Sequence, residues 1–156
     1  MSNAEIAVRL ARPEDWPALN AVMKRASISV ETGEVLRRLL DEPEHLQVAA
    51  GLIISGNVVL AEADGAPIGF ASFVINGSRY ADLDGMFVDP IYWRRGVGTM
   101  LYGAVEHELV KRQSVGVRVM AGPTAVPFYM SVGFAVVGEQ RTPLGPIVPV
   151  MTKVIT

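Results

Sequence analysis

The spacing of apolar residues in the first third of the chain predicts one strand followed by helices. After an extended stretch over residues 5–12, apolar side chains recur every three or four positions over residues 16–28 and 32–41, which is the period of an amphipathic helix. Residues 45–55 have a less regular pattern and end at Gly56, a residue type favoured just after a helix. We therefore expect two helices and a further helical segment here.

The middle of the chain predicts three antiparallel strands in succession. Valine and leucine are frequent over residues 57–63, and the dipeptides Asp64-Gly65 and Asn76-Gly77 separate this stretch from residues 67–75 and 80–88. Asp-Gly and Asn-Gly favour tight hairpin turns, because the central residues of such turns adopt a positive φ. Two hairpins in a row are expected.

The last third of the chain alternates between helix and strand. A helix is expected around Gly98, since apolar residues four positions apart form one face: Val97, Leu101, Val105 and Leu109. Further strands are expected on either side of a short helix that carries Phe128 and Tyr129: residues 115–120, 135–140 and 147–155. Asp15 and Thr124 are the expected N-caps of the first and last helices. These elements predict a single α+β domain over residues 1–156, with about seven strands and about four helices.

Composition narrows the classes of function. Hydrophobic residues make up 50% of the 156 residues and charged residues 19%, which is typical of a globular domain and not of a disordered chain. The net charge is -2, and the chain lacks the dense Lys/Arg stripe that binding to nucleic acid requires. No apolar run approaches the roughly 20 residues of a membrane span. We expect a cytoplasmic protein without a nucleic-acid or membrane partner.

Cysteine and histidine usage argues against several kinds of catalysis. The chain has no cysteine, which excludes disulfides, thiolate metal sites and cysteine nucleophiles. Its two histidines, His45 and His107, share no metal-ligand spacing and stand in no serine-triad motif. No metal cofactor is expected.

Residues 89–101 have the pattern of an anion-binding site. A strand leads into a glycine-containing loop that opens a helix, so unpaired backbone N–H groups meet there with the positive end of the helix dipole. Gly96 and Gly98 remove side chains that would keep a phosphate away from the backbone, and two arginines precede them. Leu101 stands where the dinucleotide fingerprint needs a third glycine, and the Gly-Lys-Ser/Thr of the P-loop is absent.

Two motifs in this order resemble a known family. The first is Val88-Asp89-Pro90 followed by Arg95-Gly96-Val97-Gly98, and the second is Ala125-Val126-Pro127-Phe128-Tyr129 followed by Gly133-Phe134. With both motifs the sequence resembles the GNAT superfamily of N-acetyltransferases over nearly its whole length. Trp93 departs from the family pattern, which usually has Arg or Gln there, and Gly122 stands where Asn is common.

The resemblance implies a site for a coenzyme. It implies a mostly antiparallel, twisted sheet in which strands 80–88 and 115–120 splay apart and form the cleft for acetyl-coenzyme A (acetyl-CoA), the acyl donor. Backbone groups at the end of the first of these strands would pair with the amides of the pantetheine arm, at Met86, Phe87 and Val88. The diphosphate would lie on the loop and helix start, at Arg94, Arg95, Gly96, Val97, Gly98 and Thr99. The simpler interpretation is two ordinary paired core strands.

Three side chains are candidates for the chemistry. The resemblance implies that Tyr129 is the general acid that returns a proton to the coenzyme A sulfur. Asp82 and Asp84 are two positions apart on the cleft-lining strand and so share one face. Some family members have a general base at the position of Asp82, often acting through water. The alternatives are that Tyr129 is a plain buried aromatic residue and that the carboxylates are solvated or ion-paired.

The function implied by the resemblance is transfer of an acetyl group from acetyl-CoA to an amine of a small molecule or a protein. The alternative is a sensor or regulatory module that binds acyl-CoA without turnover. The acceptor is not indicated, because the segments that would set specificity, residues 18–56 and 141–149, show no decisive charge pattern. A homodimer is compatible with the resemblance, since dimers are frequent among similar proteins.

Overall fold

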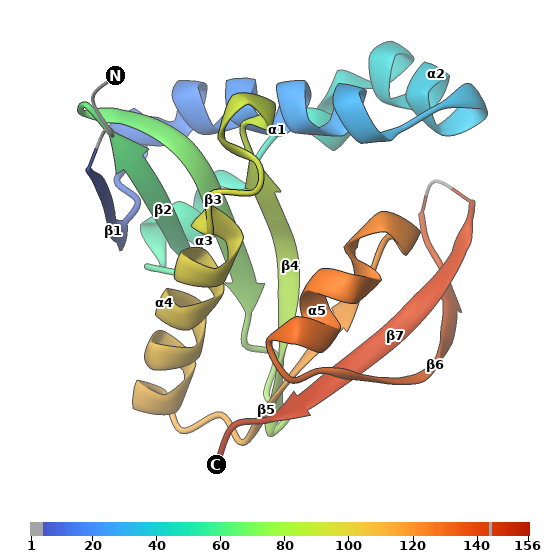
Figure 1. Ribbon diagram of the computed structural model, residues 1–156. Coiled ribbons are helices and arrows are strands. Elements are labelled where there is room, and N and C mark those ends of the chain that lie inside the picture. The colour runs from blue at the N-terminus through green and yellow to red at the C-terminus, as the bar shows by residue number, and fades with distance from the viewer. Residues whose placement is uncertain (1–4, 144) are drawn as a thin grey trace.

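One seven-stranded sheet runs through the molecule, in the spatial order β1-β2-β3-β4-β5-β7-β6 (Figure 1). The computed structural model describes residues 5–143 and 145–156. β4 and β5 are parallel, and every other neighbouring pair is antiparallel. The predicted mixed, mostly antiparallel sheet is confirmed, and its strands are Ile6–Leu10 (β1), Val58–Ala63 (β2), Ala66–Val74 (β3), Tyr80–Val88 (β4), Gly116–Met120 (β5), Ala135–Arg141 (β6) and Ile147–Val154 (β7).

The described residues form five α-helices, one more than the sequence suggested. They are Trp16–Val30 (α1), Gly33–Asp41 (α2), Ala50–Ile54 (α3), Val97–Lys111 (α4) and Val126–Ser131 (α5). The ambiguous segment 45–55 accounts for the difference, because it divides between the end of a 3₁₀ turn, Pro43–Leu46, and the short helix α3. Gly56 follows α3 with φ 75°, as expected for a residue that ends a helix.

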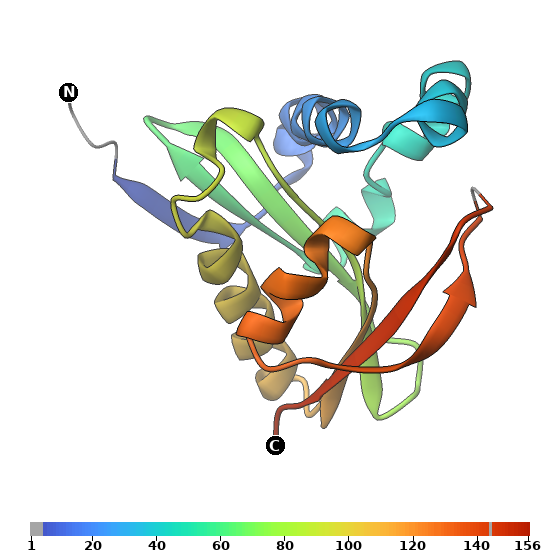
Figure 2. The same cartoon turned by 45° about the vertical axis from the view of Figure 1, so that its right-hand side comes forward.

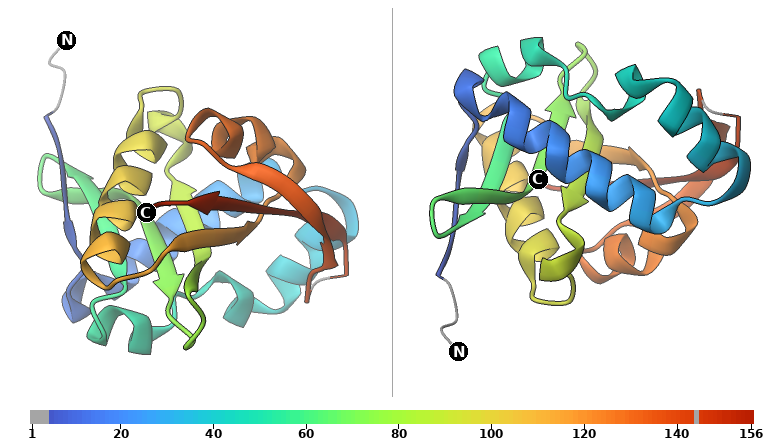
Figure 3. Two further views of the ribbon diagram at one scale, coloured as in Figure 1. Left: turned by 90° about the horizontal axis from the view of Figure 1, so that it is seen from below. Right: turned by 90° about the horizontal axis from the view of Figure 1, so that it is seen from above.

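The helices cover both faces of the sheet. Figure 3 shows α1 in front of the strands when the molecule is seen from above and α4 in front when it is seen from below. The apolar face predicted for α4 is buried, with Val97, Leu101, Val105 and Leu109 all at 2% exposure or less. On the opposite face Leu19 and Val22 of α1 join a second apolar cluster with Leu60 and Phe70 of the sheet. Each face of the sheet therefore packs in its own hydrophobic core, one with α4 and the other with α1.

Two helix starts differ from the expectation. Asp15 occupies the N-cap position of α1, but its carboxylate makes no cap bond to that helix. It accepts hydrogen bonds from the Arg9 guanidinium, at 2.9 and 3.0 Å, and from the Arg12 backbone N–H at 2.7 Å. At α5 the N-cap is Ala125 and not Thr124, because a 3₁₀ turn, Pro123–Ala125, leads into the helix. The predicted cap position of Asp15 is confirmed, although without a cap bond, and the prediction for Thr124 was wrong.

β4 and β5 touch at one end only. Tyr80 to Leu83 pair with Gly116 to Val119, and beyond Leu83 the rest of β4 has no strand partner on this edge among the described residues. At the paired end Gly116 is required, because a Cβ there would overlap the Tyr80 ring. At the other end β5 follows β7, since the Ala121 N–H donates to the Pro149 carbonyl at 2.9 Å. The predicted splay of the two strands is confirmed (Figure 2).

β4 also contains a β-bulge where it leaves β5. Ser72 of β3 lies opposite Gly85, whereas the next β3 residue, Phe73, lies opposite Leu83. Asp84 is therefore the extra residue, and the bulge reverses which side chains face α4. Ala81 and Leu83 face the α4 core before the bulge, and Met86 and Val88 pack against it afterwards.

Within the described part of the chain no helix is long and apolar enough to cross a membrane.

Candidate active site

The free edge of β4 presents backbone hydrogen-bonding groups to the cleft. The Asp89 N–H donates to Ile68 of β3 at 2.8 Å, and no described peptide bond is cis. Because C=O and N–H of a trans peptide point in opposite directions, the Val88 carbonyl points away from β3 and into the cleft. In an antiparallel ladder the backbone N–H and C=O of successive residues point alternately to one side and the other. The N–H and C=O of Met86 therefore also face the cleft, and those of Phe87 face β3. Of the three residues predicted to pair with pantetheine, Met86 and Val88 thus present backbone groups to the cleft, and Phe87 presents its backbone groups to β3.

The loop after β4 ends in a helix start with free amides. Gly96 is the N-cap of α4 with φ 79°, a left-handed conformation that favours glycine. The first intrahelical bond comes from Met100, whose N–H donates to the Gly96 carbonyl at 3.1 Å. The preceding N–H groups of the first turn, Val97 to Thr99, therefore have no acceptor within the helix. The structure thus has the glycine-containing helix start, with amides free of helical acceptors, on which the predicted anion site depends.

The lack of a side chain at Gly98 has a role in packing, in addition to the expected role of leaving room for a phosphate. A Cβ at Gly98 would lie 3.2 Å from Cε1 of Phe128 in α5. The missing side chain lets α5 approach the start of α4, and Phe128 precedes Tyr129 in that helix. The close approach of Gly98 and Phe128 thus joins the start of α4 to the helix that carries Tyr129.

Two arginines supply positive charge at the α4 start. Arg95 lies over the ring of Tyr92 at 5.3 Å, and Arg94 has a positive φ of 64°. Neither side chain forms a salt bridge within the described residues, and both are exposed. Their charges are therefore available to an anion bound at this helix start.

An ion pair between a half-exposed arginine and a buried aspartate, which sequence reasoning missed, fixes the beginning of the loop. Asp89 is 8% exposed, and its Oδ2 accepts from Nε of Arg25 at 2.9 Å and lies 2.7 Å from Nη2. Its Oδ1 accepts a longer bond, 3.4 Å, from the Ile91 N–H. Arg25 belongs to α1, so this pair attaches that helix to the anion-binding loop. Nothing in the sequence identified a partner 64 positions earlier.

Tyr129 is enclosed by aromatic rings. Its ring packs edge-on against Phe128 at 5.2 Å and Phe134 at 5.4 Å, and the residue is 6% exposed. Burial raises the pKa of Tyr129 to about 12. At this pKa the phenol keeps its proton at neutral pH. Its hydroxyl makes no hydrogen bond to any of the described residues, so its O–H is free to donate one.

Asp82 and Asp84 line one pocket at the point where β4 and β5 part. The pocket has a volume of about 280 Å³ and is lined by Val74, Asp82, Leu83, Asp84, Arg118, Met120 and Gln140. The sequence prediction that the two carboxylates share a face agrees with this arrangement. Their surroundings nevertheless differ.

Asp82 is paired and Asp84 is not. The Asp82 carboxylate accepts from Nε of Arg118 at 3.0 Å and from the Asn76 amide at 2.7 Å. Asp84 forms no ion pair among the described side chains. Burial of its carboxyl raises the pKa of Asp84, a hydrogen bond with the Ser72 hydroxyl partly offsets this, and the negative charge of Asp82 adds a smaller upward contribution.

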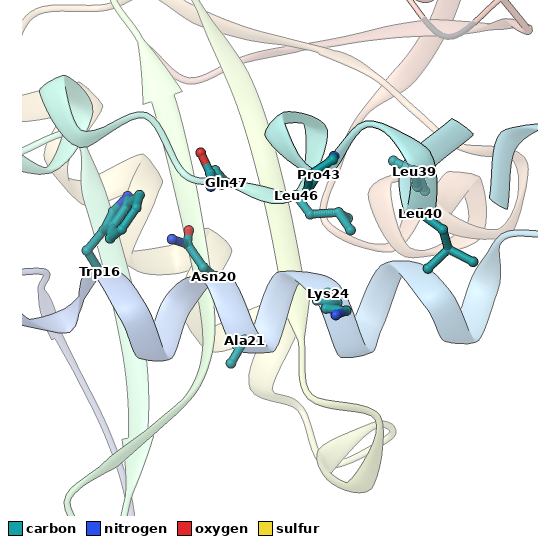
Figure 4. Close-up of a pocket in the computed structure, with 9 residues that line it drawn as sticks. All are labelled: Trp16, Asn20, Ala21, Lys24, Leu39, Leu40, Pro43, Leu46 and Gln47. Carbon is teal, nitrogen blue, oxygen red and sulfur yellow. The ribbon is translucent and has the colours of Figure 1, made fainter. Parts of the chain in front are cut away.

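A second groove lies between α1 and residues 39–47. It has a volume of about 320 Å³ and is lined by Trp16, Asn20, Ala21, Lys24, Leu39, Leu40, Pro43, Leu46 and Gln47 (Figure 4). Two hydrogen bonds of 2.8 Å hold the neighbouring segment to α1, from the Trp16 indole to the Val48 carbonyl and from the Val48 N–H to Asn20. None of the predicted site residues lies in this groove.

Three side chains of metal-ligating type meet on the surface beside this groove. Oxygen and nitrogen atoms of Glu42, Glu44 and His45 lie within 4.8 Å of one another. Glu42 is already engaged by Arg38 at 3.2 Å. The cluster is remote in sequence and topology from the β4 cleft, and it contributes no residue to the site.

Comparison of the sequence with known families identifies the class of protein to which this fold belongs. A family model described as an acetyltransferase (GNAT) domain matches residues 41–154. The chain therefore belongs to the GNAT acetyltransferase family.

A curated relative is also described as an N-acetyltransferase. An uncharacterized N-acetyltransferase of Escherichia coli K12, YafP, is 36% identical over 89 residues, which cover 57% of this chain and 53% of that protein. The match thus spans about half the length of this curated relative.

Solved structures of the family share the fold. The PaiA N-acetyltransferase of Thermoplasma acidophilum, in complex with coenzyme A, superposes with a TM-score of 0.78 at 20% identity, covering 96% of this chain and 99% of that one. The ribosomal-protein-alanine N-acetyltransferase of Brucella melitensis superposes with a TM-score of 0.71 at 22% identity, covering 95% and 99%. At these identities the likeness shows the architecture alone.

Proposed function

We propose that this chain transfers an acetyl group from acetyl-CoA to a primary amine, across the gap between β4 and β5. The observation that carries the proposal is a free strand edge leading to a helix start with unpaired amides. Pantetheine has amide groups along an extended arm and is followed by a diphosphate, so the order of its groups matches the order of these protein groups. The coenzyme A named in the PaiA structure supports the same choice of ligand.

The coenzyme is held mainly by backbone groups. Met86 and Val88 offer N–H and C=O groups to the pantetheine amides, and residues 97–99 offer N–H groups to the diphosphate. Each neutral hydrogen bond contributes about 0.5–1.5 kcal/mol and each bond to a charged group about 1.5–3 kcal/mol. The diphosphate end therefore dominates the affinity, with Arg94 and Arg95 adding a salt-dependent contribution.

Tyr129 assists departure of the thiol. As the amine nitrogen bonds to the thioester carbon and the C–S bond breaks, the sulfur needs one proton. A phenol with a pKa of about 12 holds its proton more tightly than a thiol near 8.5, by roughly 5 kcal/mol. Tyr129 therefore acts mainly by donating a hydrogen bond to the sulfur as negative charge develops there, and full transfer of its proton, which completes the thiol, costs about 5 kcal/mol. Solvent then restores the phenol.

Asp84 is the better base of the two strand carboxylates. The amine must lose one proton to become a neutral product amide, and a carboxylate with a raised pKa accepts it more readily. Each oxygen of Asp82 already accepts one hydrogen bond, Oδ1 from Arg118 and Oδ2 from Asn76. We assign to Asp82 the supporting role of raising the pKa of Asp84.

Binding and turnover together test the proposal. Calorimetry should show coenzyme A binding, and a thiol-release assay with acetyl-CoA should show turnover with some members of an amine panel. Binding without turnover for any amine would favour the sensor module instead. Absence of coenzyme A binding by well-folded protein would exclude both functions.

A further inference from the structure

The side chain of Trp93 binds one carbonyl on the edge of β4 that has no strand partner. Its indole Nε1 donates a hydrogen bond of 2.7 Å to the Val88 carbonyl, although the residue itself remains 40% exposed. Trp93 lies at the end of the 3₁₀ turn Pro90–Tyr92, directly before the arginines of the anion-binding loop. It stands at the position where the resemblance leads one to expect Arg or Gln.

The carbonyl that Trp93 holds is one that the proposed coenzyme would use. The Val88 C=O points away from β3, because the N–H of the same peptide group donates to Ile68 at 2.8 Å. It therefore points to where a pantetheine amide would add to the β4 edge. The indole N–H and the pantetheine N–H approach this oxygen from the same open side of the strand.

We propose that Trp93 is a cap on the coenzyme channel that pantetheine displaces. In the free protein the indole satisfies the Val88 carbonyl and shields the end of the β4 edge. When acetyl-CoA binds, its amide replaces the indole on this oxygen, and Trp93 swings towards solvent. This inference rests on the proposed coenzyme site and adds to it a residue that opposes binding.

The cap predicts an unusual effect of a conservative substitution. Trp93→Phe retains an aromatic side chain but has no N–H, so the coenzyme no longer has to replace a hydrogen bond. Since one such bond corresponds to a factor of about 2 to 10 in an equilibrium constant, coenzyme A should bind about 2- to 10-fold more tightly to this variant. An indole that served as an ordinary coenzyme contact would have the opposite effect, because its loss would weaken binding.

Intrinsic fluorescence can follow the displacement directly. The chain has two tryptophans, so Trp16→Phe leaves Trp93 as the single reporter, and Trp16 binds Val48 away from the cleft. Coenzyme A should shift the emission of this variant to longer wavelength, with the same dissociation constant that calorimetry gives. Trp93→Phe, whose emission comes from Trp16, is the matched control and should show no shift.

The outcomes separate the cap from the coenzyme site itself. A wavelength shift in the Trp16→Phe protein together with tighter binding by Trp93→Phe would support the cap. Calorimetric binding without the shift, or weaker binding by Trp93→Phe, would overturn the cap and leave the coenzyme site standing. No binding to the wild-type chain would overturn both.

Discussion

At the scale of single residues, the hydroxyl of Tyr129 is the clearest test of chemistry against packing. Tyr129→Phe keeps the ring contacts with Phe128 and Phe134 and removes a hydroxyl without a protein partner. The free energy of unfolding should change by less than about 0.5 kcal/mol. Loss of a proton donor should lower kcat by about 100-fold or more. Steady-state kinetics and calorimetry should show this loss with coenzyme A affinity unchanged, and an intact kcat would refute the assignment.

Replacing Asp84 should increase stability and decrease activity. Its pKa is raised in the folded protein, so its contribution to stability is fully present below the unfolded pKa and decreases as pH rises through the folded value. Asp84→Asn removes the ionised form and should raise Tm at about pH 7, with little change near pH 4. The same variant should lose kcat/KM. Thermal melts at the two pH values check the sign, and a lower Tm at neutral pH would contradict it.

The role of Asp82 can be separated from that of Asp84 by the pH profile. Asp82 carries a negative charge that raises the pKa of Asp84. Asp82→Asn should therefore move the acidic limb of the kcat/KM profile to lower pH without abolishing turnover. If Asp82 itself were the base, this variant would instead lose most of its activity at every pH.

At the scale of elements, the start of α4 depends on one backbone conformation. Gly96→Ala places a side chain at φ 79°, which costs about 1–2 kcal/mol, and it disturbs the amides that would hold the diphosphate. Both the free energy of unfolding and coenzyme A affinity should fall. Gly103→Ala is a matched control in the same helix, where an added Cβ meets no atom within 4 Å. It should stabilise the protein by about 0.5–1 kcal/mol and leave affinity unchanged.

The ion pair between Arg25 of α1 and Asp89 of the loop leads to a second prediction at the scale of elements. Arg25→Ala leaves the Asp89 carboxylate, which is largely buried, without its partner, so we expect the free energy of unfolding to fall by about 1–3 kcal/mol. The loop should also bind coenzyme A less tightly. Lys111→Ala removes an exposed pair with Glu108 at 3.4 Å and should cost less than about 1 kcal/mol. Equal effects of the two variants, measured by denaturation and calorimetry, would refute a special role for Arg25.

The elements themselves could largely be predicted from the sequence, because they follow local patterns. The strand over 80–88 and the buried face of α4 appeared where the spacing placed them. The bulge at Asp84 could not be predicted, since it results from the register between two strands. The Arg25–Asp89 pair depends on the packing of α1 across the sheet, and the partner of Asp82 depends on β5 lying parallel to β4. In the candidate site, sequence therefore indicated the groups but not which carboxylate is paired.

At the scale of the whole molecule, the pocket beside the cleft should select acceptors by charge. Asp82 and Asp84 are opposed by Arg118 alone among its lining residues, so the pocket has a net negative charge when both carboxylates are ionised. A cationic amine is attracted to it, whereas a carboxylate on the acceptor is repelled. Two unit charges about 6 Å apart near a protein surface interact by about 2–3 kcal/mol. Tyramine should therefore have a kcat/KM on the order of 10-fold or more above that of tyrosine.

This preference should depend on Asp82 in a defined way. Asp82→Asn makes the lining neutral and releases the Arg118 guanidinium, which is then free to bind an acceptor carboxylate. The ratio of kcat/KM for tyramine and tyrosine should fall towards one in this variant. Added salt should reduce the ratio in the wild-type protein, because the pocket opens to solvent and the charges are screened. A wild-type protein that preferred tyrosine would show that some charge outside this lining governs the acceptor.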